Sequence, residues 1–311
     1  MVNKDFKSVI ELLETFDTEQ KCIDHLEQIR WTGNVVSPFD PDSVVYKCKN
    51  NRYRCRKTGK YFNVRTQTLF EGTKIPLRKW FVAIWLITGH KKGISSLQLS
   101  RELDITQKTA WFMLHRIRNC YDIDYGVLSG EVEVDETYVG GKNKNRHKHK
   151  KIEGTQGRSL EGKSAVLGMA ERDGEIKAFK ITGVSSFQIQ PEVMWHVDQD
   201  AKVYTDEWAG YKGLGRIYDH KSVVHKKGEY VRGRVHTNTI EGFWSLLKRM
   251  INGTYHFTSS KHLQKYVDEM VFRYNTRNQG ECSRFNAMLS LSGSRLTYQQ
   301  LIYNGKEEVT D

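Results

Sequence analysis

The sequence predicts an α/β domain with a mixed sheet flanked by helices, preceded by a helical region and a small β ribbon-like module. Three observations support this fold class. Strand and helix patterns follow one another in the order β–β–β–α–β–β–α from residue 131 to residue 277. Apolar residues recur at helical spacing over 4–31 and 74–119. Between these helical stretches, residues 34–72 form a short, turn-rich and basic segment of strand-like composition.

The N-terminal half is expected to be mainly helical. Apolar residues at helical spacing predict a helix over 4–16, and Thr18 is placed to cap a second helix that follows it. Pro76 suits the first turn of a further helix. We expect four segments along the chain: 1–73 with helices and the ribbon-like module, 74–125 with a helix-turn-helix, 126–284 with the α/β domain, and 285–311 as an appendage.

The α/β domain is predicted from alternation and turn chemistry. Acidic and apolar residues alternate at period two from residue 131, which indicates a strand. Asp173 and Gly174 between two apolar runs are a strong hairpin signal. The remaining predicted elements are a helix at 187–200, short strands at 202–206 and 221–227, and helices at 238–251 and 259–277.

Composition limits the class of protein and the kind of partner. Of the 311 residues, 38% are hydrophobic and 28% charged, which is typical of a globular chain. The formal net charge of +12 favours a polyanionic partner such as nucleic acid. The most apolar stretch, 80–89, is too short to span a bilayer, and we expect neither a membrane span nor a signal peptide. Five irregularly spaced cysteines predict reduced thiols in a cytoplasmic protein.

Residues 93–120 have the pattern of a helix-turn-helix. Such a motif places the start of its second helix near base edges in the major groove and its basic residues near phosphates. On the outer face of the second helix we expect Gln107, Lys108, His115, Arg116 and Arg118, and all of these except His115 are assigned to DNA contact together with its cap, Thr106. The alternative is an ordinary two-helix hairpin with a leucine stripe, but the basic charge of the chain favours DNA binding.

The ribbon-like segment contains two cysteines, Cys48 and Cys55. A zinc ribbon needs two knuckles that together place four ligands around the ion. Here the upstream knuckle reads "VVSPFD", and Thr58 stands where the second thiol of the other knuckle belongs. Two thiols do not complete a zinc site, so we interpret the segment as a ribbon-like fold that has lost its metal. A site completed by Cys22 or a histidine is the alternative.

A basic run follows the first strand of the α/β domain. Its cationic residues Lys142, Lys144, Arg146 and Lys148 are predicted to contact DNA phosphates. The alternative is a solvated loop, which is the usual role of a charge run. We reject a metal site at His147 and His149, because the surrounding lysines repel a cation.

One strand carries acids on a single face. Glu131, Glu133 and Asp135 point to one side of this strand, and Val132 and Val134 to the other. Acids in a protein interior are costly unless they bind something positive. The strand therefore predicts a site for a positive group.

Three acids stand at the ends of predicted elements: Asp135 ends a strand, Asp206 closes a later strand, and Glu241 begins a later helix. Acids so placed can meet at one edge of a sheet, where three carboxylates would hold two Mg²⁺ or Mn²⁺ ions. Two such ions serve an in-line displacement at phosphorus. Each acid also has a structural alternative: Asp206 as a turn cap, Asp135 in an ion pair with a lysine, and Glu241 in a capping box with Asn238.

The three acidic stretches, "VDETYVGG", "YTDEWAGY" and "HTNTIEGFWSLLKR", resemble those of DDE transposases encoded by bacterial insertion sequences. The resemblance is to the ISXO-two-like group, whose members carry an N-terminal zinc ribbon and a helix-turn-helix. It covers most of the chain, since "KIPLRKWFVAIWL", "GISSLQLSREL" and "TQKTAWFMLHRIR" also resemble that group. The sequence departs from the group at the ribbon, where most of the metal-binding cysteines are absent.

The resemblance implies an RNase H-like catalytic domain with a divalent metal site. Asp135 and Asp206 match the two aspartates, and Glu241 matches the third acid. Some relatives use asparagine as the third ligand, which keeps Asn238 as an alternative. Lys248 matches a lysine that approaches terminal DNA, and Arg249 beside it is expected to contact DNA as well.

The expected function is that of an insertion-sequence transposase. It would bind the terminal inverted repeats of its element as a homodimer or larger assembly, cleave the DNA, and join a freed 3′-hydroxyl to double-stranded target DNA. Two alternatives are a domesticated DNA-binding regulator, in which the acids are structural, and a structure-specific nuclease on the same fold. The presence of all three acids and Lys248 favours catalysis over the first, and a separate end-binding region argues against the second.

Overall fold

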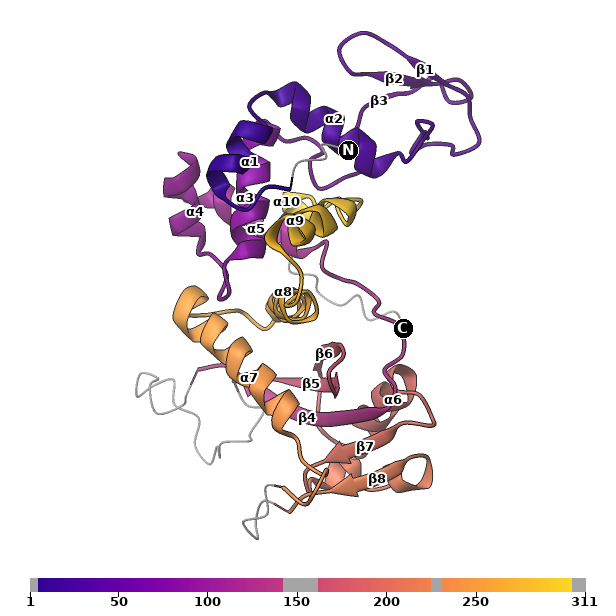
Figure 1. Cartoon of the computed structure of the whole chain (residues 1–311), viewed down its shortest axis with the longest axis vertical. Coiled ribbons are helices and arrows are strands. Elements are labelled where there is room, and N and C mark those ends of the chain that lie inside the picture. Colours follow the sequence, from indigo (N-terminus) through magenta and orange to yellow (C-terminus); the bar gives the residue numbers. More distant parts are fainter. Residues whose placement is uncertain (1–4, 142–161, 225–230, 304–311) are drawn as a thin grey trace. The chain divides into compact units, whose positions relative to one another are not determined.

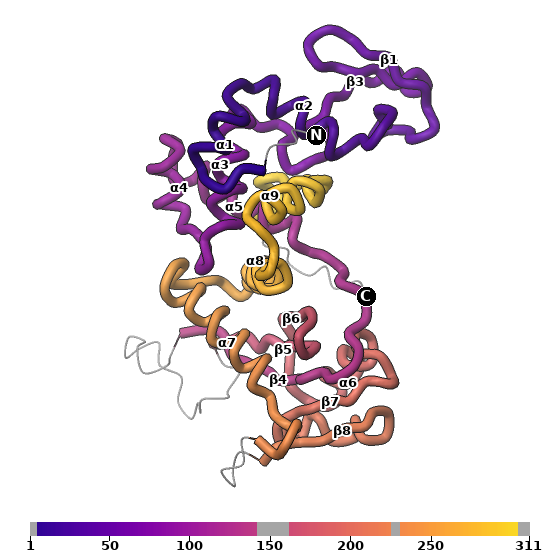
Figure 2. The backbone as a smooth tube through the Cα atoms, viewed as in Figure 1, coloured from indigo at the N-terminus to yellow at the C-terminus, as the bar shows by residue number. Residues whose placement is uncertain are grey.

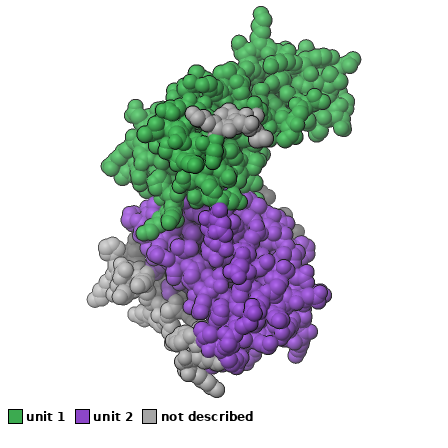
Figure 3. Space-filling model, viewed as in Figure 1, with its two compact units in different colours: residues 1–122, 279–311 green, residues 123–278 purple. Residues whose placement is uncertain are grey.

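The computed structural model describes residues 5–141, 162–224 and 231–303 of the chain. The polypeptide forms two compact units, one of residues 1–122 with 279–311 and the other of residues 123–278 (Figure 3). Each unit has its own core and is described by itself. In the part of the chain described here, no helix is both long enough and apolar enough to span a membrane.

The unit of residues 123–278 is built on a five-stranded mixed sheet. Its strand order is β6-β5-β4-β7-β8, in which β4, β5 and β6 are antiparallel neighbours and β7 and β8 run parallel to β4. The strands are β4 (Glu131–Val139), β5 (Ser164–Glu171), β6 (Ile176–Ile181), β7 (Lys202–Thr205) and β8 (Asp219–Ser222). The predicted mixed α/β sheet and the hairpin at Asp173 and Gly174 are confirmed. The last strand begins two residues before its predicted start, because Asp219 pairs with Lys202 of β7.

Helices cover both faces of this sheet. They are α6 (Ser186–His196), α7 (Asn238–Met250) and α8 (Leu263–Asn275). Val132, Val134 and Val203 form a core on one face with residues of α6. On the other face, Val166 and Ala178 pack with residues of α7 and α8. Helix α7 crosses β4 and β5 (Figures 1 and 2). It lies on the acidic face of β4, since Glu133 and Asp135 both contact residues of this helix.

The other unit is helical around an aromatic core. Its helices are α1 (Val9–Thr15), α2 (Glu19–Arg30), α3 (Leu77–Gly89), α4 (Ser96–Leu103), α5 (Gln107–Arg118), α9 (Glu281–Ser290) and α10 (Tyr298–Ile302). Thr18 caps α2 as expected, and α3 begins directly after Pro76. The ring of Phe285 lies 5.4 Å from both Phe6 and Phe81. The C-terminal residues therefore complete the core of the N-terminal helices.

A three-stranded antiparallel ribbon belongs to this same unit. It consists of β1 (Val45–Lys47), β2 (Tyr53–Cys55) and β3 (Tyr61–Phe62). Trp31, which follows α2, packs edge-on against Tyr53, and Tyr53 stacks on Phe62 with ring centres 5.7 Å apart. Aromatic packing thus stabilises this small sheet.

Candidate active site

Two acids emerge together from neighbouring parallel strands. Glu133 of β4 pairs with Tyr204 of β7, and Asp135 and Asp206 each lie two residues beyond this pair. The prediction that Asp135 ends its strand is wrong, because β4 continues to Val139 and Asp135 lies in its middle, beside the point where β7 ends at Thr205. In this parallel register the two acids lie side by side. Asp206 is buried, with 6% of its surface exposed, and its Oδ1 accepts the Trp208 backbone N–H at 2.8 Å.

The charges of this pair repel one another. Burial, followed by the nearby charges of Glu136 and Asp206, raises the pKa of Asp135 to about 8. The Trp244 Nε1–H, which donates to Asp135 Oδ2 at 3.0 Å, acts in the opposite direction. A carboxyl group that ionises with difficulty beside a second acid is suited to a divalent cation, which accepts both carboxylates as hard oxygen ligands.

The raised pKa predicts a dependence of stability on pH in the metal-free protein. Because folding raises the Asp135 pKa from 3.8 to about 8, the folded state holds a proton between these values that the unfolded chain has lost. This contribution to stability is complete below the lower value and disappears as the pH rises through the higher one. We expect the melting temperature in EDTA to be lower at about pH 9 than at about pH 6, by roughly 5 °C.

The Asp135→Asn variant provides the control for this measurement, because it lacks the titrating carboxyl. Its melting temperature should differ much less between the two pH values. An equal difference in the variant and the parent protein would assign the pH dependence to other groups.

A further acid lies on the opposite face of β4. The Tyr211 hydroxyl donates to Glu136 Oε2 at 2.7 Å, and both side chains are buried. Burial, and then the charges of Glu136 and Asp135, raise the pKa of Tyr211. The alternating pattern of β4 places Glu136 on the face opposite Asp135, and its contact with Tyr211 becomes evident only in the folded domain.

The start of α7 differs from the predicted capping box. The helix begins at Asn238, its N-cap residue is Thr237, and Glu241 lies in its first turn. The Thr237 hydroxyl donates to Glu241 Oε1 at 2.8 Å, a contact between the cap residue and the acid itself. The pairing of Asn238 with Glu241 is therefore wrong by one position, because Thr237 and Asn238 are both good N-cap residues in sequence.

Glu241 is exposed, unlike Asp206. Among the described residues, no group of three or more His, Cys, Asp and Glu side chains is arranged to hold a metal ion. The structure thus brings Asp135 and Asp206 together and leaves Glu241 outside a common ligand group. Asn238, the alternative ligand, is exposed at the first position of the same helix, and Lys248 and Arg249 are exposed further along it.

Trp244 of α7 reaches Asp135 across the space that a glycine leaves on the neighbouring strand. Gly168 of β5 is the register partner of Asp135. A Cβ atom at Gly168 would lie 2.5 Å from the Trp244 ring and 2.8 Å from the Ile240 side chain. The missing side chain thus leaves the space in which the indole lies and from which it reaches the carboxylate.

The predicted DNA-contacting residues of α5 divide into two groups. Thr106 caps the helix by accepting the Thr109 N–H at 3.3 Å, and Thr106, Gln107 and Lys108 are exposed. The Gln107 side chain donates to Ser96 Oγ of α4 at 2.8 Å, which joins the two helices. These three positions agree with the expected outer face.

The other group is buried, and its placement on the outer face is wrong. His115, Arg116 and Arg118 are exposed by 0%, 5% and 1%. The Arg116 guanidinium donates to the backbone oxygen of Glu71 and lies 5.7 Å from the centre of the Trp80 ring. Helical spacing showed the basic positions but not that they are buried, with residues 71 and 80 against Arg116. Arg116 and Arg118 are therefore removed from the DNA-contacting set.

Cys48 and Cys55 are not placed to share a zinc ion. Cys55 of β2 pairs with Val45 of β1, and Cys48 lies three residues after Val45. At the usual rise per residue, Cys48 is therefore about 10 Å along the ribbon from Cys55. Burial raises the pKa of Cys55, but hydrogen bonds with Ser37, Ser43 and Thr58 outweigh it and lower the pKa to about 6. Hydroxyl groups therefore surround this sulfur at the predicted knuckle positions.

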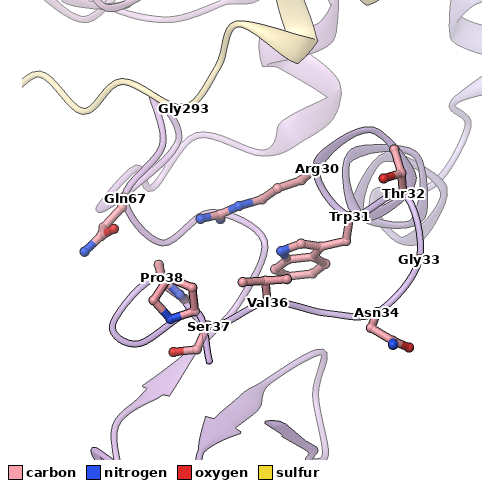
Figure 4. Close-up of a pocket in the computed structure, with 11 residues that line it drawn as sticks. Arg30, Trp31, Thr32, Gly33, Asn34, Val36, Ser37, Pro38, Gln67 and Gly293 are labelled. Carbon is pink, nitrogen blue, oxygen red and sulfur yellow. The ribbon is translucent and has the colours of Figure 1, made fainter. Parts of the chain in front are cut away.

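A pocket beside the ribbon is lined by Arg30, Trp31, Ser37, Pro38 and other residues (Figure 4). The Arg30 guanidinium lies 5.4 Å from the Trp31 ring centre and donates to the Val64 backbone oxygen at 2.8 Å. None of the predicted catalytic residues lines this pocket.

The predicted phosphate-binding residues of the basic run, which are Lys142, Lys144, Arg146 and Lys148, lie outside the described residues.

Comparison with known proteins identifies relatives of the chain. The model of the ISXO2-like transposase domain matches residues 127–275. A protein of Halobacterium salinarum described as belonging to transposable element ISH50 is 32% identical over 253 residues, which cover 77% of this chain and 85% of the relative.

Two solved structures are also similar at a lower level. The Mos1 strand transfer complex has 12% identity and a TM-score of 0.29 over 73% of this chain and 82% of that one. A pre-cleavage Mos1 transpososome has 12% identity and a TM-score of 0.26 over 93% and 97%.

Proposed function

Because the chain belongs to the ISXO2-like transposase family, we propose that it binds the terminal inverted repeats of its element and catalyses metal-dependent DNA strand cleavage and strand transfer. The observation that carries this proposal is the pair of acids, Asp135 and Asp206, which lie together where β7 ends beside the middle of β4. An RNase H-like assignment of the domain agrees with a sheet of three antiparallel strands extended by two parallel ones.

Asp135 and Asp206 would hold a divalent cation, Mg²⁺ or Mn²⁺, with Glu241 as the third ligand and Asn238 as the alternative. When bound, two such ions would stabilise the attacking and leaving oxygens at phosphorus. Asp135 must first release the proton that its raised pKa retains. The Trp244 N–H orients the Asp135 carboxylate by donating to one of its oxygens, which leaves the other for a ligand bond.

The basic residues are assigned to DNA. Thr106, Gln107 and Lys108 at the exposed start of α5 would read the end sequence. Lys248 and Arg249 on α7 would hold the strand near the acids. The cationic run at 142–148 would contact phosphates. A homodimer would bring two element ends together.

A substrate comparison tests this function. We expect the purified protein with Mg²⁺ to nick linear DNA at the inverted repeats that flank this gene, and to leave four-way junctions of unrelated sequence intact. Cleavage of the junctions without cleavage at the repeats would instead identify a structure-specific nuclease. Binding to the repeats without any cleavage, in Mg²⁺ and in Mn²⁺, would identify a DNA-binding regulator.

A further inference from the structure

Glu133 is a fully buried acid that the proposed mechanism does not use. It lies on β4 two residues before Asp135, and none of its surface is exposed. A buried carboxylate is costly unless hydrogen bonds and positive charges satisfy both of its oxygens. The partners of Glu133 therefore indicate what it does.

One oxygen binds the start of α7. Glu133 Oε2 accepts the backbone N–H of Thr239 at 2.7 Å and that of Ile240 at 3.2 Å. These two donors belong to the first turn of the helix, whose N–H groups have no partner within the helix. The N-cap residue Thr237 makes no side-chain cap to the backbone, so Glu133 takes that role from another element.

The other oxygen binds three side chains. Glu133 Oε1 accepts the Thr239 hydroxyl at 3.0 Å and the Arg172 Nε–H at 2.9 Å. His236 Nδ1 lies 3.1 Å from the same oxygen. Arg172 also contacts the backbone oxygen of His236, so the segment leading into α7 is fixed by the same cluster.

We infer that Glu133 is a positioning residue, whose carboxylate holds the first turn of α7 on β4 and so sets where Glu241 lies for metal binding. This inference rests on the proposed function for its catalytic consequence. Glu241 follows Ile240 directly, and its own N–H donates to the Thr237 backbone oxygen at 3.0 Å. The acid thus lies within the turn that Glu133 holds, while β4 carries Asp135 two residues away.

The Glu133→Gln variant separates this role from packing, because glutamine has the same shape. Its amide nitrogen cannot accept a hydrogen bond. In one orientation this nitrogen faces the Thr239 and Ile240 N–H groups, and both bonds to the first turn of α7 are lost. In the other orientation the amide oxygen keeps these two bonds, but the nitrogen faces the Arg172 Nε–H. In both orientations a buried donor faces a donor, and the negative charge that holds the first turn of α7 and Arg172 together is removed.

Glu131→Gln is the matched control. Glu131 lies on the same face of β4 and accepts from the same Arg172 at 2.7 Å. Its other contacts are with Arg234 and Tyr204, and no contact joins it to Thr239 or Ile240 among the bonds recorded for the described residues. This variant changes the charge beside Arg172 while leaving the helix anchor in place.

Three measurements on the full chain test the inference. In Glu133→Gln, we expect hydrogen exchange in a peptide spanning 237–243 to be at least tenfold faster. The dissociation constant for Mn²⁺, followed by the electron paramagnetic resonance of the free ion, should rise about tenfold, and cleavage should fall about 10- to 100-fold. Glu131→Gln should match the parent protein in exchange and in Mn²⁺ affinity.

The outcomes distinguish this inference from the proposed function. Unchanged exchange, or faster exchange with unchanged Mn²⁺ affinity, would overturn it, because Glu133 would not position the metal-binding acid. Absence of cleavage in the parent protein would overturn the proposed function and leave the exchange and Mn²⁺ results to decide on Glu133. If Glu133→Gln does not fold, Thr239→Val, which removes one hydroxyl contact, should show a smaller change in the same two quantities, and no change would overturn the inference.

Discussion

The Asp206→Asn variant should lose strand cleavage by roughly a thousandfold or more while its binding to the element ends stays within about twofold. Asparagine keeps the shape of the side chain and an oxygen that can accept the Trp208 N–H, so the turn after β7 should remain. What it lacks is the negative charge that, with Asp135, would neutralise a divalent cation. The residues assigned to end recognition lie on α5, in the other compact unit.

Asp219→Asn is the matched control for this experiment. Asp219 begins β8, at the opposite end of the parallel strands from Asp206, and its exposed carboxylate contacts only Lys221 among the recorded ion pairs of the described chain. Cleavage should be followed on labelled ends in Mg²⁺, and binding by electrophoretic mobility shift in EDTA. Full cleavage by Asp206→Asn would show that Asp206 is not required for catalysis.

The pair of acids could be predicted from sequence only in part. Asp206 directly follows the end of β7, as predicted, whereas Asp135 lies in the middle of β4 and not at its end. The parallel pairing of β4 with β7 brings the two acids together. The strand order itself depends on contacts between distant segments. For this reason the sequence predicted that the acids converge, but not that Asp135 pairs with a glycine of β5.

The roles of the buried polar residues could not be predicted in the same way. Glu133 follows the same alternating pattern as Glu131, and only the position of α7 gives it two backbone donors. Arg116 has the helical spacing of an exposed base, and a segment 45 residues earlier covers it. In both cases the partner is remote in sequence, so local pattern determines the face of an element but not what covers that face.

Gly168→Ala is expected to destabilise the protein by about 1–3 kcal/mol and to reduce cleavage, although it adds a single methyl group. The added Cβ would lie 2.5 Å from the Trp244 ring and 2.8 Å from Ile240. Neither side chain can move freely, since Trp244 is 4% exposed and Ile240 is 0% exposed. The backbone of Gly168 is not among the positive-φ positions recorded for the described residues, so the cost comes from the clash and not from backbone strain.

The clash should act on the site through Trp244. A shifted indole no longer donates to Asp135 Oδ2, and α7, which carries both Trp244 and Glu241, moves away from β4. Gly242→Ala is a suitable control, because it adds the same methyl group to α7 at a position with nothing within 4 Å. Alanine is the better helix former, so this variant should be as stable as the parent protein or more stable by up to about 1 kcal/mol.

A double-mutant cycle assigns the effect to the indole. Trp244→Phe removes the ring atoms that the new methyl group would meet, so the added cost of Gly168→Ala should fall by at least half in that background. Cleavage should not recover, because phenylalanine cannot donate to Asp135. Urea unfolding gives the stabilities, and an equal cost of Gly168→Ala in both backgrounds would show that the glycine is required for a reason other than the place of Trp244.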